Sequence, residues 1–278
     1  MMRQLIRITD PDDPAIVEFT NIRERDLTRS GGRFIAEGTV VLRMLAAAHH
    51  AGTRFKAHKI LLLENRVDGL DDILSAFPPD VPVYVASGDV LDRIAGFHLH
   101  RGVLALGERL EPPPLNEVLN GLPQRALVVV CQGLANHDNA GSIFRNAAAF
   151  GVSHIILDET SCDPLYRKAI RVSVGSVLTV PYARGGNIEA LLQTLKDNGF
   201  AFWGLSPAGK TSIRALPNSE RTALILGTEG EGLPPHLLAS IKTARIPQMP
   251  GLDSLNVATA AGIALYETAH AMGLLPDL

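Results

Sequence analysis

The chain has 278 residues, of which 46% are hydrophobic, and 26 Lys and Arg residues against 29 Asp and Glu residues give a formal net charge of −3. The net charge is not positive and the sequence contains no basic tail or block, so an RNA partner would have to be held by local patches. No uncharged apolar run reaches the ~18 residues of a membrane span, and the N-terminus lacks the apolar core of a signal peptide. We therefore expect a soluble protein.

Cysteine usage limits the chemistry further. Cys131 and Cys162 lie far apart, without a CxxC motif or matching His spacing. This pattern argues against a zinc site and against a disulfide scaffold. We expect a cytoplasmic protein in a reducing compartment, with no metal and no membrane partner.

The first half of the chain reads as a compact alternating α/β unit. Apolar residues recur at helical spacing early on, and later apolar runs are typical of buried strands. The expected elements are a helical stretch over 16–51, strand 59–64, helix 70–77, strand 81–86, helix 89–95 and strand 102–106. Three consecutive prolines then favour an extended spacer. We predict domains at 1–108 and 125–278, joined by a linker at 109–124.

The second half opens with the strongest strand pattern in the chain, ALVVVCQGL at 126–134. A helix over 140–150 and a strand over 154–158 complete a βαβ unit, which implies a parallel sheet with a right-handed crossover. The stretch 176–184, helix 187–199, strands 200–206 and 222–227, and a last helix over 256–272 follow. The predicted fold class is α/β in both domains.

Ligands in such sheets gather beyond the carboxyl ends of the strands, so the loops that leave strands are informative. In NHDNAGSIFR, Asn139 is placed to cap a helix, Gly141 permits close backbone approach, and Arg145 lies one turn further on, where a phosphate or ribose could be met. An ordinary helix cap with a solvated Arg explains the same spacing. Neither GxGxxG nor GxxxxGK[ST] is present.

Two later loops are also polar and rich in glycine. LGTEGEGLPP at 226–235 follows a strand and places Glu229 beside glycines that let backbone approach a ligand. In the run 246–267, Ser254 and Asn256 precede a helix of small residues. Taken singly, each of these loops is more often structural than functional.

Together and in this order, the three loops resemble the signature motifs of the SpoU/TrmH RNA 2′-O-methyltransferases of the SPOUT superfamily. NxGxxxR at 139–145 is similar to the first motif, LGTEGEGL to the second and SLNVATAAGIALYE to the third, while RVSVGS at 171–176 matches an intervening segment. The segments NIRERD, RFIAEGTVVL and HRGVLAL resemble the L30e/L7Ae-like RNA-binding domain that many members carry.

The resemblance implies S-adenosyl-L-methionine as the methyl donor, bound in a deep trefoil knot. It places Gly227, Ile246 and Leu255 around the adenosyl group, with Leu226 lining the same pocket. The glycines of the second motif would then shape a cofactor loop.

The same resemblance places the catalytic residues Asn139, Arg145, Ser254 and Asn256 around the target ribose, and Glu229 is expected to hold the loops or Asn139 in register. Arg145 is expected to be essential. Because a guanidinium resists deprotonation, an RNA phosphate held by Arg145 is the alternative proton acceptor. Asn136-His137 and Gln248 depart from the usual Asp-Pro and Met of the family without removing a catalytic residue.

RNA contacts are expected from two local clusters of basic residues: Arg23, Arg25, Arg29 and Arg33, and then Arg167, Lys168 and Arg171. A solvated mixed-charge helix face explains the first cluster equally well. The resemblance also implies a homodimer, with the small-residue helix near 258–264 at the interface and active sites that draw residues from both subunits.

The leading hypothesis is an S-adenosylmethionine-dependent RNA ribose 2′-O-methyltransferase, with ribosomal RNA favoured over transfer RNA as substrate. A non-catalytic RNA-binding or ribosome-assembly protein is the first alternative. The second is an α/β enzyme whose glycine loop holds the phosphates of a nucleotide.

Overall fold

The computed structural model describes residues 4–20, 27, 32–96, 99, 101–251 and 253–276. The chain divides into two compact units, one formed by residues 1–111 with 165–179 and the other by residues 112–164 with 180–278. The chain therefore passes from one unit to the other at three places. Within the described residues, no helix combines the length and apolar character needed to cross a membrane.

Unit 1 contains a five-stranded sheet in the order β1-β4-β3-β5-β2. Strands β1, β4 and β3 are parallel, whereas β5 runs antiparallel to both β3 and β2. Its elements are β1 (Leu5–Ile8), η1 (Pro14–Phe19), β2 (Arg33–Glu37), α2 (Thr39–His50), β3 (Phe55–Leu63), η2 (Glu64–Gly69), α3 (Asp71–Ser75), β4 (Val83–Ala86), α4 (Gly88–Ala95), β5 (Val103–Arg109), α7 (Arg167–Val172) and η3 (Ser176–Leu178).

The helical stretch expected over 16–51 is wrong in its middle part. Phe34, Ile35 and Ala36 are buried in strand β2, which pairs with β5, and Gly38 with φ 92° turns the chain into α2. A short apolar run fits a helix and a buried strand equally well, so periodicity could not separate the two. Glycine at position 38 adopts a positive φ that other residues avoid.

The segment 165–179 packs within unit 1, although residues before and after it belong to unit 2. The Arg167 guanidinium lies 3.1 Å from the Glu37 carboxylate, whose side chain is only 8% exposed. Gly175 has φ +85°, and a Cβ there would lie 2.9 Å from Cγ of Met44 in α2. The motif RVSVGS is thus held against β2 and α2.

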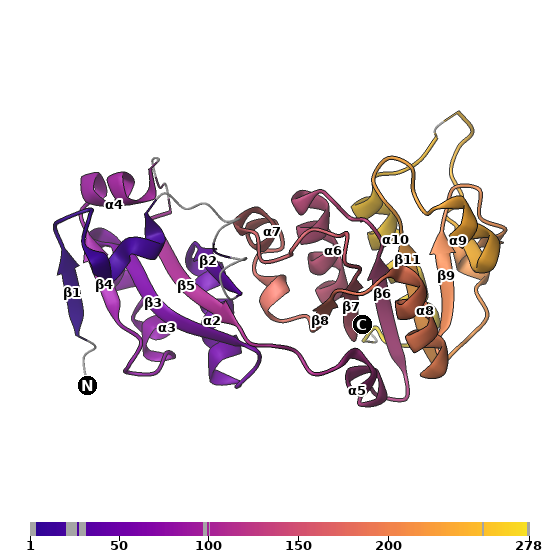
Figure 1. Cartoon of the computed structure of the whole chain (residues 1–278), viewed down its shortest axis with the longest axis horizontal. Coiled ribbons are helices and arrows are strands. Elements are labelled where there is room, and N and C mark those ends of the chain that lie inside the picture. The colour runs from indigo at the N-terminus through magenta and orange to yellow at the C-terminus, as the bar shows by residue number, and fades with distance from the viewer. Residues whose placement is uncertain are drawn as a thin grey trace. The chain divides into compact units, whose positions relative to one another are not determined.

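Unit 2 is built on a seven-stranded sheet in the order β10-β12-β9-β11-β6-β7-β8. Figure 1 labels five of these strands, β9, β11, β6, β7 and β8. All neighbouring strands are parallel, as the βαβ pattern predicts. Its elements are α5 (Leu115–Asn120), β6 (Ala126–Cys131), α6 (His137–Ala149), β7 (His154–Leu157), β8 (Tyr182–Arg184), α8 (Ile188–Asp197), β9 (Ala201–Leu205), β10 (Thr211–Ser212), η4 (Ile213–Ala215), β11 (Arg221–Leu226), α9 (Pro235–Ser240), β12 (Lys242–Arg245) and α10 (Val257–Ala271).

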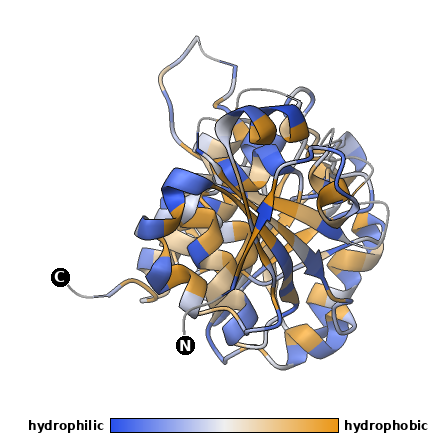
Figure 2. Ribbon diagram, turned by 90° about the vertical axis from the view of Figure 1, so that its left-hand side faces the viewer, coloured by the Kyte–Doolittle hydropathy of each residue, from blue (hydrophilic) through white to orange (hydrophobic). Residues whose placement is uncertain are grey.

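Successive side chains of the central strands point to opposite faces of the sheet. Val128 and Val130 of β6 join Ile225 of β11 in a core that also includes residues of α5, α8 and α9. Helix α10 packs against α6, where Nδ2 of Asn146 donates to the carbonyl of Ala258 at 2.9 Å. Figure 2, in which the left-hand side of Figure 1 faces the viewer, shows orange hydrophobic residues along many of the strands, with blue hydrophilic residues between them. Burial of these runs on both faces is the reason that the strands read as continuous apolar segments.

Candidate active site

A pocket of about 290 Å³ lies at the carboxyl ends of β9, β11 and β12, within unit 2. All four predicted cofactor residues line it: Leu226, Gly227, Ile246 and Leu255. Three loops meet there because the strands are parallel and end at the same edge of the sheet. The prediction that ligand-binding loops gather at this edge therefore agrees with the geometry.

The glycine-rich loop after β11 closes on itself. The backbone N–H of Thr228 donates to the carbonyl of Gly232 at 3.1 Å. A Cβ on Gly227 would lie 2.2 Å from the carbonyl carbon of Gly232 and 2.3 Å from the nitrogen of Leu233. No side chain fits in that space, so glycine at position 227 is a steric requirement of this loop.

Glu229 lines the pocket and ties its loop to the one between β6 and α6. Its carboxylate accepts from Nδ2 of Asn139 at 3.1 Å, from the N–H of Asn136 at 2.9 Å and from the N–H of Ala135 at 3.3 Å. Burial acts to raise the pKa of Glu229, but these hydrogen bonds together outweigh it, and the pKa lies below its usual value. The carboxylate is therefore a charged acceptor, as the expected holding role requires.

Asn139 is buried in α6 and connects Glu229 to the third loop. Its Oδ1 accepts from Nδ2 of Asn256 at 2.9 Å, and Oδ1 of Asn256 accepts from two N–H groups in the first turn of α10, those of Ala258 and Thr259. The prediction that Asn139 caps its helix is wrong, because Asn136 caps α6 through the N–H of Asp138. Asn139 lies one turn too far along, and its amide serves the loops instead.

Arg145 is exposed on α6 and does not line the pocket of its own chain. It has no hydrogen-bond or ion-pair partner within the described residues. Ser254 does line the pocket, and Asn256 follows it at the start of α10. The structure thus brings together four of the five predicted catalytic residues and leaves Arg145 apart.

The polar lining of the pocket is acidic. Glu229, Glu231 and Asp253 contribute carboxylates, and no Lys or Arg occurs among the described residues that line it. Phosphates are bound by Lys, Arg or cradles of backbone N–H groups, whereas a sulfonium carries a positive charge. The lining suits a cationic donor and disfavours a nucleotide triphosphate.

Sequence reasoning missed several pocket residues, among them Ser206, Thr228, Gln248 and Asp253. Glu231 is exposed and also lines the pocket. Ser206 and Thr228 follow strands β9 and β11, and their position after apolar runs was the available signal. Gln248 follows β12, which was not expected as a strand, and Asp253 lies in the loop before α10.

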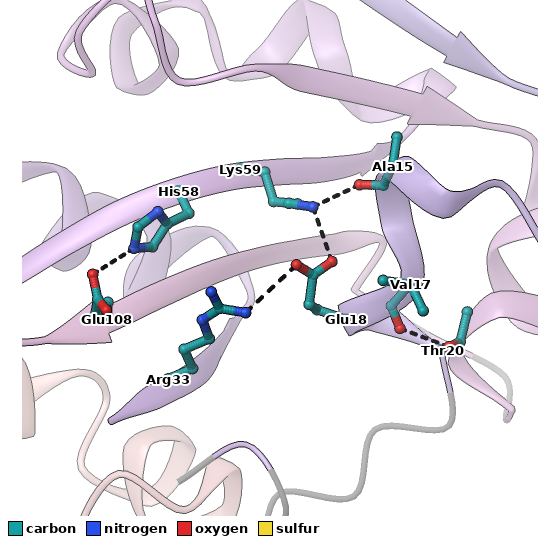
Figure 3. Close-up of polar contacts among 8 residues, drawn as sticks. All are labelled: Ala15, Val17, Glu18, Thr20, Arg33, His58, Lys59 and Glu108. Atoms are coloured by element: carbon teal, nitrogen blue, oxygen red, sulfur yellow. Dashed lines mark hydrogen bonds and ion pairs between the residues drawn. The ribbon is translucent and has the colours of Figure 1, made fainter. Parts of the chain in front are cut away.

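Of the first group of predicted RNA contacts, Arg23, Arg25 and Arg29 lie outside the described residues. Arg33 begins β2, and its guanidinium lies 3.8 Å from the carboxylate of Glu18 (Figure 3). Nζ of Lys59 donates to the same carboxylate at 2.9 Å and to the carbonyl of Ala15 at 2.7 Å. Arg33 therefore belongs to an ion-pair cluster that fastens η1 to the sheet of unit 1.

The second group lies on α7. Arg167 is engaged by Glu37, and its side chain is 22% exposed. Lys168 and Arg171 are exposed. Arg167 thus pairs with Glu37 within unit 1, and Lys168 and Arg171 are exposed residues of the same helix.

Residues 126–266 match the SpoU rRNA Methylase family. An uncharacterized tRNA/rRNA methyltransferase of Mycobacterium bovis is 40% identical over 269 residues, which cover 94% of this chain and 90% of the relative. The chain therefore belongs to the SpoU family of RNA methyltransferases.

Two solved structures extend the comparison. An AdoMet-bound rRNA methyltransferase from Sinorhizobium meliloti is 27% identical, with a TM-score of 0.78 over 98% of this chain and 99% of that one. A structure from work on the 2-OH methylation of C/U34 on tRNA is also 27% identical, with a TM-score of 0.51 over 55% of this chain and 100% of that one.

Proposed function

We propose that this chain transfers a methyl group from S-adenosyl-L-methionine to the ribose 2′-hydroxyl of a nucleotide in structured ribosomal RNA. The observation that carries the proposal is the pocket at the strand ends, lined by all four expected cofactor residues and by carboxylates. The likeness to the S. meliloti rRNA methyltransferase spans nearly the whole chain, whereas the tRNA-related structure matches about half. That difference in coverage favours ribosomal over transfer RNA.

S-adenosylmethionine supplies an electrophilic methyl group on a positively charged sulfonium. Leu226, Ile246 and Leu255 provide apolar walls for its adenosyl part, and the carboxylate of Glu229 lies on the same pocket. The glycine-rich loop brings its backbone to the wall without intervening side chains. These residues would hold the donor and orient its methyl group toward the substrate.

The remaining task is to align the 2′-oxygen with the methyl carbon and to accept its proton. Such positioning contributes roughly 7–11 kcal/mol to lowering a barrier. Ser254 lies at the pocket, and Asn139 and Asn256 are locked in orientation by their mutual hydrogen bond and by Glu229. We assign Glu229, Asn139 and Asn256 to holding this geometry, and Ser254 to contact with the ribose.

Arg145 completes the site in a homodimer, because it is exposed on α6 and absent from the pocket of its own chain. It holds the RNA phosphate that takes the 2′-proton. The small residues Ala258, Ala261 and Ala264 are buried, so the α10 contribution to the interface comes from its exposed residues, including Ile263 and Tyr266.

Unit 1 recruits the RNA in this proposal, as an L30e/L7Ae-like domain, and the exposed Lys168 and Arg171 are its proposed phosphate contacts. The deep trefoil knot and the domain boundaries at 108 and 125 stay predictions. Mapping ribose methylation across total RNA, in cells with and without the gene, would identify the nucleotide. A modified position in transfer RNA alone would contradict the ribosomal assignment.

The test of the catalytic assignment is Arg145→Ala. We expect this variant to bind S-adenosylmethionine with parental affinity, since other loops form the pocket, and to lose methyl transfer. Calorimetry measures the binding, and methyl incorporation into RNA measures the transfer. Transfer at the parental rate would contradict the role of Arg145.

A mixing experiment tests whether the site is shared. Leu255→Trp is designed to fill the pocket, so Arg145→Ala and Leu255→Trp chains should each be inactive alone. Equal mixing should restore about a quarter of the parental rate, because about half of random dimers are mixed and each holds one complete site. No recovery would place Arg145 in the site of its own chain.

A further inference from the structure

The loop between β6 and α6, residues 132–136, has an unusual pattern of hydrogen bonds. The N–H of Gly133 donates to Oδ1 of Asp158 at 3.0 Å, and the N–H of Leu134 donates to Oγ of Ser161 at 3.0 Å. The next two N–H groups, those of Ala135 and Asn136, donate to Glu229. Consecutive backbone donors are thus held by side chains from two other loops.

Asp158 is the centre of the first half of this arrangement. It is 3% exposed at the carboxyl end of β7, and its Oδ1 accepts from Oγ of Ser161 at 2.6 Å and from the N–H of Ser161 at 2.9 Å. Its Oδ2 accepts from Oγ1 of Thr160 at 2.7 Å. Burying a carboxylate costs free energy unless such donors surround it. Removing the carboxylate would leave all of these donors without an acceptor.

The loop also lies directly against a wall of the pocket. Gly133 has φ +64°, and a Cβ there would lie 2.7 Å from Cγ2 of Thr228, which lines the pocket. A shift of a few tenths of an ångström in this loop would therefore displace the side chain of Thr228. It would also displace Asn139, which follows in the first turn of α6 and donates a hydrogen bond to Glu229.

We propose that Asp158, acting through Ser161 and the backbone of Gly133, is a positioning residue for methyl transfer. The carboxylate fixes the first half of the loop, as Glu229 fixes the second half, and together they set the orientation of Asn139 and Asn256. This inference rests on the proposed function for its kinetic consequence. Its structural consequence, the ordering of the loop by Asp158, is measurable without RNA.

The main variants are Asp158→Ala and Ser161→Ala. We expect hydrogen exchange at the N–H groups of Ala135 and Asn136 to accelerate about tenfold or more, although both still face Glu229. We expect kcat to fall about tenfold or more, with the dissociation constant of S-adenosylmethionine changed less than about threefold. If Asp158→Ala does not fold, Ser161→Ala alone carries the test.

Asp158→Asn is the conservative variant, because its amide oxygen can replace Oδ1 and accept the same three donors. We expect it to retain kcat within about threefold of the parental value and to keep the slow exchange. Thr160→Val is the matched control, since it removes only the donor to Oδ2. Exchange in β11, outside the loop, should stay parental in every variant.

Unchanged exchange at Ala135 and Asn136 in Ser161→Ala would overturn the inference. Equal losses in kcat and donor affinity, together with faster exchange in β11, would also overturn it, because they indicate general destabilisation. The variants could show faster hydrogen exchange in the loop while the parental protein methylates no RNA. That result would contradict the proposed function but would still identify Asp158 as the residue that orders the loop.

Discussion

Glu229 shows how one side chain couples segments that are far apart in sequence. Its carboxylate accepts hydrogen bonds from the N–H groups of Ala135 and Asn136 in the loop before α6 and from the side chain of Asn139 in the first turn of α6. Its own backbone belongs to the loop after β11. The hydrogen bonds from Asn139 and the backbone favour the ionised form. They therefore make the stability of the site depend on pH.

For Glu229→Gln we expect the free energy of unfolding at pH 7 to fall by about 1 kcal/mol, a low value because the side chain is partly exposed. The folded-state pKa of Glu229 is lowered from 4.5, so its stabilisation is present above that pH and is lost as pH falls through the folded pKa. Urea unfolding should show the gap between parent and variant closing below about pH 4.5.

Glu231→Gln is the control, because Glu231 lies in the same loop and has no hydrogen-bond partner within the described residues. Its unfolding midpoint should follow the parental one at every pH. A constant gap for Glu229→Gln down to about pH 3 would contradict an ionised, hydrogen-bonded carboxylate.

Among the elements, the loop after β11 has a backbone conformation that requires glycine at particular positions. The number of glycines in the loop matters less than these positions. Gly227 faces the backbone of Gly232 and Leu233, whereas a Cβ on Gly230 would meet no other atom within 4 Å. The same residue type in one motif is thus required at one position and replaceable at another. Only the folded loop distinguishes them.

We expect Gly227→Ala to lower the free energy of unfolding by about 3 kcal/mol and to abolish donor binding, because backbone atoms must move to admit the methyl group. Gly230→Ala should stay within about 0.5 kcal/mol of the parental stability. Thermal unfolding and calorimetry measure both effects. Equal stability of the two variants would contradict the closed geometry of the loop.

At the scale of the whole molecule, the main feature is that residues 165–179 pack within unit 1 while their neighbours in the chain belong to unit 2. Ile170, Val177 and Leu178 are buried there, and Arg167 pairs with Glu37. The two units are therefore not separable by one cut in the linker.

A fragment of residues 112–278 should expose this segment, since β2 and α2 are absent from it. We expect trypsin to cut the fragment after Arg167, Lys168 or Arg171 about tenfold faster than the full chain. Mass spectrometry of timed digests identifies the sites. Equal rates in fragment and full chain would show that α7 and η3 fold without unit 1.

Sequence patterns predicted the central strands of both units well, because β3, β4, β6, β7, β9 and β11 are apolar runs bounded by polar or glycine residues. They missed the short strands at or next to the sheet edges, β1, β2, β10 and β12. Most of these strands carry few buried positions, so they leave little periodicity to detect. Asp158 was not predicted for a different reason. Its proposed positioning role depends on contacts with Gly133 and Ser161 and not on any motif.

The sequence by itself determined the α/β class, the parallel sheet of the second unit and the three loops, because these follow from local patterns of apolar residues, glycine and proline. The four predicted cofactor residues, which are among those that line the pocket, came from the resemblance of the loops to the SpoU/TrmH motifs. Tertiary structure alone decided that Asn139 bridges Glu229 and Asn256, that Arg145 lies outside its own pocket, and that residues 165–179 join unit 1. Each of these depends on residues distant in sequence, and no local pattern records which distant segments will meet.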